Sequence, residues 1–272
     1  MISIFRKIRQ KLLKQNQVTR YLVYAIGEIL LVVIGILIAL QVNNWNELRK
    51  ARSQELATMK EVIENLKYDI LRSEKNSVKN FDLLIGLDSL RISITNTIEG
   101  KDETVKIYYF ALKYGQDYSQ VSLNRTAYDQ LINSGTIQLI ANRQLVQDLS
   151  DYYERKSYAV LSYDPEIGLR DMKNIQKKFI QLRGLDDYIQ SFDSISDNTY
   201  TPDYDYKDLL QREDLQLLKP DQLKLDDYLN EISQFQLDLK NYNFYTSWAK
   251  ESAEKLLQDI EKEYKIISKG NS

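Results

Sequence analysis

An unbroken apolar run near the N-terminus constrains the fold of this chain more than any other feature of its sequence. Between Leu22 and Val42 it carries fourteen Leu, Ile or Val residues and one charged residue, Glu28. As a helix rising ~1.5 Å per residue, this run spans roughly 31 Å, the thickness of a bilayer's hydrocarbon core. Each aliphatic residue favours insertion by about 0.3–0.6 kcal/mol, whereas a central carboxylate opposes it by about 2.5–3.5 kcal/mol. The sequence therefore predicts a membrane-spanning helix within residues 21–46.

The charges beside this run predict its orientation. Residues 1–20 carry six basic side chains and no acidic one, namely Arg6, Lys7, Arg9, Lys11, Lys14 and Arg20. By the positive-inside rule this tail is expected in the cytoplasm, with residues 47–272 exported. Two interpretations of the tail stay open. Its charges only fix the orientation, or it forms a basic amphipathic helix on an anionic membrane surface.

A cleaved signal peptide is the competing interpretation of the apolar run, and it fits less well. The run is too long for the apolar region of a signal peptide, and no A-x-A-like cleavage site follows it. Tyr21 and Tyr24 at one end and Trp45 at the other are typical of interfacial anchors. We therefore expect an uncleaved signal anchor in the inner membrane, followed by a periplasmic domain.

The composition favours helix and argues against most enzyme classes. The chain has nine Gly and three Pro, and 28% of its residues are charged, which favours helix over sheet. It has no Cys and no His, so disulfides, a thiolate nucleophile and the most frequent general base are excluded. A net charge of −2 gives no reason to expect nucleic acid as a partner. We expect a non-enzymatic protein with no catalytic residue, cofactor or metal site.

Two long segments poor in helix breakers frame the expected exported domain. Residues 48–98 contain no Pro and one Gly, and residues 221–267 contain neither. Both show apolar residues every three to four positions, as amphipathic helices do. In the first segment this stripe, which resembles a coiled-coil seam, comprises Leu56, Met59, Ile63, Leu66, Ile70, Val78, Phe81, Ile85 and Leu87. The predicted fold class is all-α, with one transmembrane helix followed by a domain built on a long antiparallel helix pair and shorter helices.

Two single residues mark boundaries of the shorter helices. Gly135 follows an expected helix near 123–133 and suits the left-handed position that ends many helices. Asn142 is suited to cap the next helix, because its side-chain oxygen can accept a backbone N–H.

Two stretches of the chain resemble a known family. YAIGEILLVVIGILIALQVNNWNELR, preceded by the basic tail, is similar to the signature of an uncharacterised family of single-pass membrane proteins found in Bacteroidota genomes. Residues 125–153, RTAYDQLINSGTIQLIANRQLVQDLSDYY, are similar to that family's central region. The matching residues include Gly27, Glu28, Gly35, Asn44, Trp45, Asn46, Gly135 and Tyr153. The resemblance implies membrane attachment and no activity, because the family is a domain of unknown function.

Glu28 is the most unusual candidate site residue, because its carboxylate lies about 10 Å inside the predicted span. At ~100° per residue, Tyr21, Glu28 and Gly35 fall on one helix face, and Ala39 joins them. Gly35 and Ala39 form a small-xxx-small pair that lets another helix approach closely. We prefer burial of Glu28 in a helix–helix contact. The alternatives are a carboxylate that reaches the cytoplasmic headgroups and a proton or ion relay.

Two classes of function follow. The preferred one is a membrane-anchored scaffold that associates through this face with itself or with another membrane protein. The other is a periplasmic module that binds a small ligand and signals through a membrane partner. The twenty tyrosines either line a pocket or, more commonly, pack between helices. An acidic stretch could hold calcium, but a solvated loop explains it better. The stretch comprises Asp193, Asp197, Asp203, Asp205 and Asp208.

Overall fold

The computed structural model describes residues 7, 18–181, 206–218 and 221–266, and every regular element within them is helical. Two helices are long, α2 (Val18–Ile98) and α9 (Gln222–Tyr264). The shorter elements are α3 (Thr104–Tyr114), α4 (Thr126–Asn133), the 3₁₀ turn η1 (Thr136–Leu139), α5 (Arg143–Ser150), the π-helical η2 (Asp151–Lys156), α6 (Ser157–Ser162), α7 (Glu166–Gln176) and the 3₁₀ turn η3 (Tyr206–Gln211). The predicted all-α class is confirmed.

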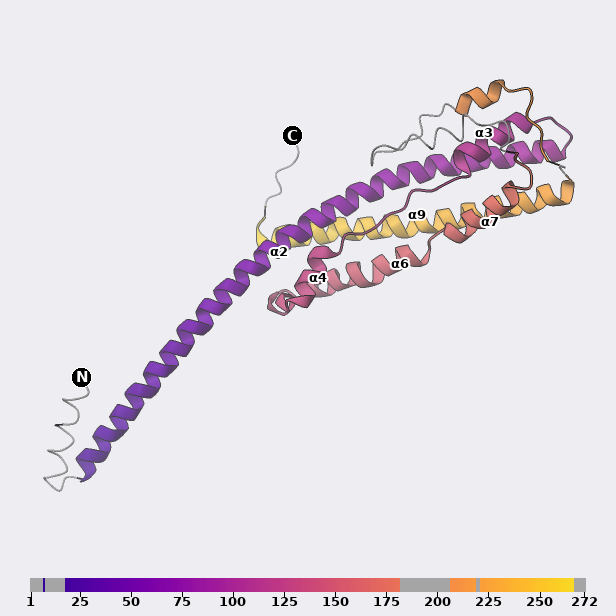
Figure 1. The fold of residues 1–272 in the computed structure, drawn as a ribbon. Helices are drawn as coiled ribbons and strands as arrows, with labels where there is room; N and C mark the ends of the chain where they lie inside the picture. Colours follow the sequence, from indigo (N-terminus) through magenta and orange to yellow (C-terminus); the bar gives the residue numbers. More distant parts are fainter. Residues whose placement is uncertain (1–6, 8–17, 182–205, 219–220, 267–272) are drawn as a thin grey trace.

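Helix α2 runs without a break from the apolar segment into the folded domain (Figure 1). Its 81 residues correspond to about 120 Å of helix. The most apolar part projects away from the other helices and is not buried within the chain. By its length and composition, α2 is able to span a membrane. The helix ends at Ile98, and Gly100 follows with a φ of 88°, a left-handed conformation that glycine adopts without strain.

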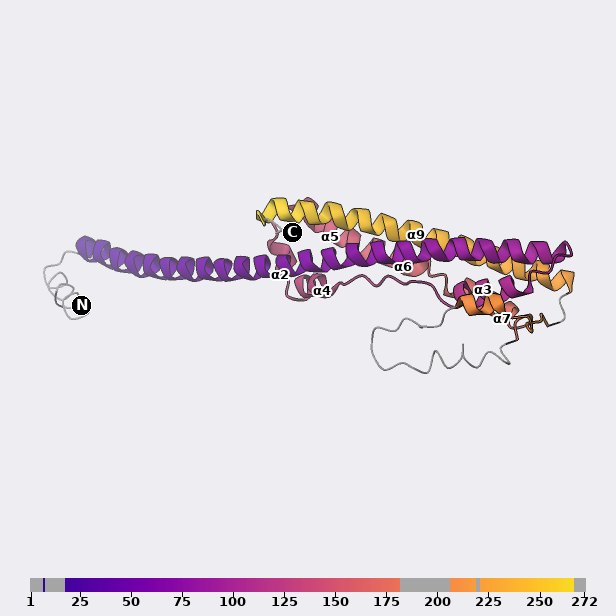
Figure 2. The same cartoon turned by 90° about the horizontal axis from the view of Figure 1, so that it is seen from above.

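Helix α9 returns along α2 in the opposite direction (Figures 1 and 2). It is capped by Asp221, whose side chain accepts a hydrogen bond from the backbone N–H of Lys224. Side-chain contacts show the antiparallel register, because residue numbers rise along α9 as they fall along α2. These contacts join Gln236 to Asp88, Asn243 to Asn80, Lys250 to Glu74 and Tyr264 to Glu55. The long antiparallel helix pair is thus confirmed.

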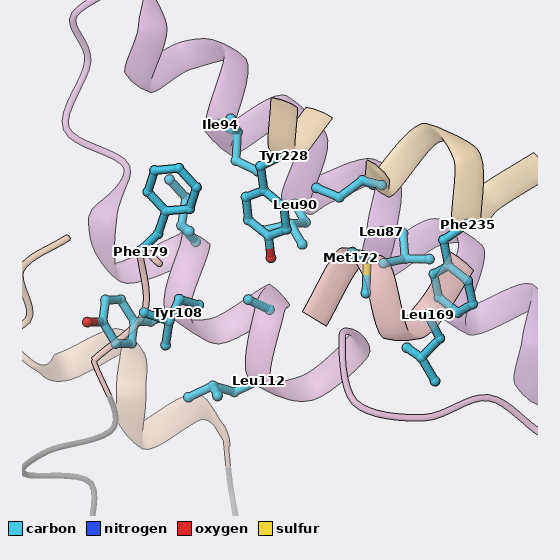
Figure 3. Packing of buried hydrophobic residues seen from close by; sticks show 14 of the residues in the cluster. Leu87, Leu90, Ile94, Tyr108, Leu112, Leu169, Met172, Phe179, Tyr228 and Phe235 are labelled. Atoms are coloured by element: carbon cyan, nitrogen blue, oxygen red, sulfur yellow. The ribbon is translucent and has the colours of Figure 1, made fainter. Parts of the chain in front are cut away.

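Two clusters of buried apolar side chains hold the domain together. The distal cluster, far from the apolar segment, joins α2, α3, α7 and α9 (Figure 3). In it the rings of Phe179 and Tyr228 stack with centroids 5.7 Å apart. The proximal cluster joins α2, α4, α5, η2 and α9, and includes Met59, Leu149 and Ala253. Each fully buried large side chain stabilises by about 1.5–3 kcal/mol, so both clusters help to hold the shorter helices on the pair.

The two predicted boundary signals are confirmed. Gly135 has a φ of 72°, the left-handed conformation expected after α4. Asn142 caps α5, because its side-chain oxygen accepts a hydrogen bond from the backbone N–H of Leu145.

The predicted apolar stripe of residues 48–98 is only partly right. Its members Met59, Ile63, Leu66 and Leu87 are buried. Leu56, Val78, Phe81 and Ile85 are exposed instead, Val78 by 71% and Phe81 by 65%. The distal core is formed on the same helix by Leu83, Leu87, Leu90 and Ile94. The buried face of α2 is polar in its middle, so an apolar stripe does not follow it.

Candidate functional site

The predicted membrane-helix face lies on the projecting part of α2. Glu28, Gly35 and Ala39 are all exposed within the single chain. A Cβ atom built on Gly35 would meet no other atom within 4 Å, so this surface is open to a second helix. Tyr21 belongs to α2, but its side chain lies outside the described residues.

The predicted anchors also lie on this helix, whereas most of the basic tail lies outside the described residues. The side chains of Tyr24 and Trp45 are 55% and 65% exposed, at opposite ends of the apolar run. Lys7 is exposed, and Arg20 is in α2 with a side chain that is not described. The orienting residues outside the described part are Arg6, Arg9, Lys11 and Lys14.

A row of buried polar residues, here called the polar seam, occupies the middle of α2. It consists of Asp69, Ser73, Asn76 and Asn80, each at most 8% exposed. The seam belongs to one continuous buried face whose positions alternate in steps of three and four residues, a spacing typical of helices packed lengthwise. These positions are Leu66, Asp69, Ser73, Asn76, Asn80, Leu83, Leu87, Leu90 and Ile94. The face is therefore apolar at both ends and polar between them.

The polar seam binds the backbone of the extended segment 117–124, which connects α3 to α4. Asn80 donates from Nδ2 to the carbonyl of Ser119 (2.9 Å) and accepts at Oδ1 from the backbone N–H of Ser119 (2.8 Å). Asn76 donates from Nδ2 to the carbonyl of Gln120 (2.5 Å). A segment outside helices has backbone groups that need partners when it is packed against a core. The seam supplies those partners and fixes the segment on α2.

Asp69 is the carboxylate of this seam, and its pKa is shifted. Burial raises its pKa from 3.8 to about 6, although hydrogen bonds from the backbone of Asn124 (2.8 Å) and from the Tyr152 hydroxyl (2.9 Å) oppose that shift. The positive charge of Arg72 also lowers the pKa of Asp69. Asp69 thus joins three elements, since α2, the 117–124 segment and η2 all meet at its carboxylate.

The π-helical element η2 places two adjacent tyrosines in the proximal core. Tyr152 contacts Asp69, while Tyr153 stacks on Tyr128 of α4 with ring centroids 4.6 Å apart. Burial raises the pKa of both hydroxyls, so both stay neutral at physiological pH. Single π-helical turns inside helices occur often at functional sites. Here both tyrosine rings of η2 are buried in the proximal cluster.

The buried tyrosines serve packing more than they line a pocket. Buried in the described structure are Tyr108, Tyr118, Tyr128, Tyr152 and Tyr153, while Tyr158 is exposed. Within the described residues, no group of three or more carboxylates lies close enough to hold a metal ion. The aspartates at 193, 197, 203 and 205 lie outside those residues, as does the side chain of Asp208.

A fully buried carboxylate fastens the end of α9 to α2, ten residues beyond Trp45. Glu55 accepts hydrogen bonds at Oε1 from the guanidinium of Arg52 and from the hydroxyl of Tyr264. The Arg52 guanidinium also lies 5.1 Å from the centroid of the Tyr264 ring. This contact ties the last turn of α9 to α2 close to the apolar segment.

An open groove of about 820 Å³ lies beside the polar seam. This basic groove is lined by Arg72, Lys75, Asn76, Val78 and Lys79 of α2 and by residues 117–120. Sequence reasoning missed both the seam and the groove. A signal for the seam was present in the sequence, because its polar residues recur at heptad spacing between two apolar stretches of the same helix.

Comparison with known proteins identifies a family. A family model matches residues 28–204, about two thirds of the chain. The chain belongs to DUF6090, a family of unknown function. Searches of the curated proteins and of the solved structures found no match.

The DUF6090 region contains most of the features described above. It begins at Glu28, so it includes Gly35, Ala39, the polar seam and the basic groove. It ends before α9, which lies outside the matched residues. Because α9 buries its apolar face against α2, the matched region by itself lacks one partner of its long helix pair.

Proposed function

We propose that this chain is a single-pass inner-membrane protein that acts, without enzymatic activity, as an interaction scaffold. In this proposal residues 1–20 are cytoplasmic, the domain is periplasmic, and chains associate through the face that carries Glu28, Gly35 and Ala39. The continuity of α2 carries the proposal. One helix supplies both the exposed apolar segment and half of the domain's core, so association in the bilayer would set the distance and rotation between two domains.

The residues of the face that carries Glu28, Gly35 and Ala39 favour contact with another helix over exposure to lipid. Gly35 and Ala39 remove side-chain bulk over one turn, which lets two backbones approach and gain van der Waals contact. A carboxylate within hydrocarbon is stabilised when it lies between helices and hydrogen-bonds a partner group. Glu28 would gain such a partner in a homo-oligomer or beside another membrane protein.

Gly35→Leu is expected to weaken self-association about tenfold, equivalent to ~1.4 kcal/mol. The isobutyl group would separate helix backbones that otherwise touch at Gly35. Association is measured in the native membrane by crosslinking from a photoreactive residue at Ala39, followed by mass spectrometry. Gly27→Leu is the matched control, because Gly27 is on the same helix, is equally open, and lies ~80° away around the axis.

Unchanged crosslinking in Gly35→Leu would refute this contact surface. Capture of the chain by itself supports a homo-oligomeric scaffold. Capture of a different membrane protein replaces self-association with an accessory role, and the identity of that partner then defines the function.

A second candidate function, ligand sensing, is favoured by the position of the basic groove. Three cationic residues of the groove belong to α2, the helix that continues into the apolar segment. A ligand bound there would act directly on the element that enters the membrane.

A further inference from the structure

We infer that the basic groove is a binding site for a small oligoanion, a ligand with two or more carboxylate or phosphate groups. The groove carries Arg72, Lys75 and Lys79 along one wall, and Asp117 is the acidic residue of its lining. An excess of positive charge within a chain of net charge −2 marks this place as electrostatically distinct. The inference does not depend on self-association.

The lysines of the groove are free to bind a ligand. Lys75 and Lys79 are exposed, and neither forms an ion pair with any described residue. Two other lysines of the helix pair are ion-paired, since Lys67 pairs with Glu64 and Lys250 pairs with Glu74. An incoming anion therefore has no internal carboxylate to displace at these two ammonium groups.

The spacing of the cations fits several linked anionic groups better than one. Successive steps from Arg72 to Lys75 and Lys79 rise ~4.5 Å and ~6 Å along the helix. The two terminal phosphates of a tripolyphosphate, or the outer carboxylates of a tricarboxylate, are separated by distances of this order and match this ladder. Lysine ammonium groups bind phosphate and carboxylate as mobile point charges, so the site requires charge spacing and not one fixed geometry.

The opposite wall of the groove is already ordered. Asn76 donates to the carbonyl of Gln120 and accepts from the Ser119 hydroxyl (2.5 Å each). The Gln120 amide donates to the Tyr118 hydroxyl (2.5 Å), which in turn donates to Asp164. A ligand would not have to order this segment, and that lowers the entropic cost of binding.

The test uses the full chain in a zwitterionic detergent at low salt, titrated calorimetrically with tripolyphosphate and with citrate. Lys75→Gln/Lys79→Gln is expected to weaken binding at least tenfold. The matched control is Lys60→Gln/Lys255→Gln, which makes the same charge change at two exposed lysines outside the groove and should stay within about twofold of the wild type. Added salt should weaken binding, because the contacts are solvent-exposed charges.

The two probes distinguish the sources of the anionic groups. Binding of tripolyphosphate alone assigns a phosphate-bearing ligand, and binding of citrate alone assigns a polycarboxylate. The charge-conserving variant Lys75→Arg/Lys79→Arg should retain binding, which separates lost charge from misfolding. No binding of either probe, or equal losses in the groove variant and the control, overturns the inference.

Discussion

Tyr152→Phe is expected to lower the free energy of unfolding by about 2–3 kcal/mol at pH 7.5 and by about 1 kcal/mol or less at pH 5. At the higher pH Asp69 is ionised, 1% exposed, and accepts the Tyr152 hydroxyl at Oδ2. Hydrogen bonds to buried charged groups contribute about 1.5–3 kcal/mol, because an unpaired charge cannot regain its hydration. Below the pKa of Asp69 the group is neutral, and the lost donor matters less.

The pH dependence has a definite sign. Burial raises the pKa of Asp69 to about 6 in the folded chain, against 3.8 for a solvated carboxyl. The folded state therefore binds this proton more tightly. The contribution of protonated Asp69 to the free energy of unfolding is fully present below pH ~4 and is lost as the pH rises through ~6. This loss is up to about 3 kcal/mol. The Tyr152 hydroxyl favours the ionised form of Asp69, so its removal should raise the pKa of Asp69 further.

Denaturant unfolding of the full chain in detergent at pH 5, 6 and 7.5 measures both effects. Asp69→Asn is the control, because it removes the titrating group and should abolish this part of the pH dependence. The same destabilisation by Tyr152→Phe at all three pH values would show that the hydroxyl acts through packing and not through the charge of Asp69.

The long elements could be predicted because their signals are local. The apolar run, the scarcity of Gly and Pro after it, and the two boundary residues Gly135 and Asn142 each act over a few neighbouring positions. The membrane face could be proposed for the same reason. Glu28, Gly35 and Ala39 recur at helical spacing within one unbroken helix, so their common face follows from geometry alone.

The polar seam could not be predicted from such signals. Asp69, Asn76 and Asn80 suggest a solvated helix face. The pattern therefore favours a stripe through the apolar Val78 and Phe81, and these two side chains are exposed. What buries the seam is a segment about 40 residues further along the chain, and its need for hydrogen-bond partners appears only when it lies on α2. The basic groove was missed with it, because one wall is that same segment.

Gly86→Leu is expected to lower the free energy of unfolding by about 1–2 kcal/mol. Gly86 lies in α2 directly beneath the Tyr114 ring, and a Cβ atom built on it would lie 2.1 Å from Cγ of that ring. The ring cannot simply retreat, because it stacks on Phe110 at 6.2 Å and lies beneath the ammonium of Lys113 at 4.9 Å. Overpacking of this kind costs about 1–3 kcal/mol or more, which exceeds the gain of ~1 kcal/mol from replacing a helical glycine.

Two comparisons isolate the contact with the ring. Gly35→Leu makes the same substitution on the same helix where no atom lies within 4 Å, so it should leave the unfolding of the domain unchanged while weakening self-association. In a Tyr114→Ala background the ring is absent, and Gly86→Leu should then cost much less, giving a coupling energy of about 1–3 kcal/mol. An additive double variant would mean that Gly86 is required for some reason other than the ring. Gly86 and Gly35 of α2 thus have separable roles, Gly86 in packing the domain and Gly35 in the proposed contact between chains.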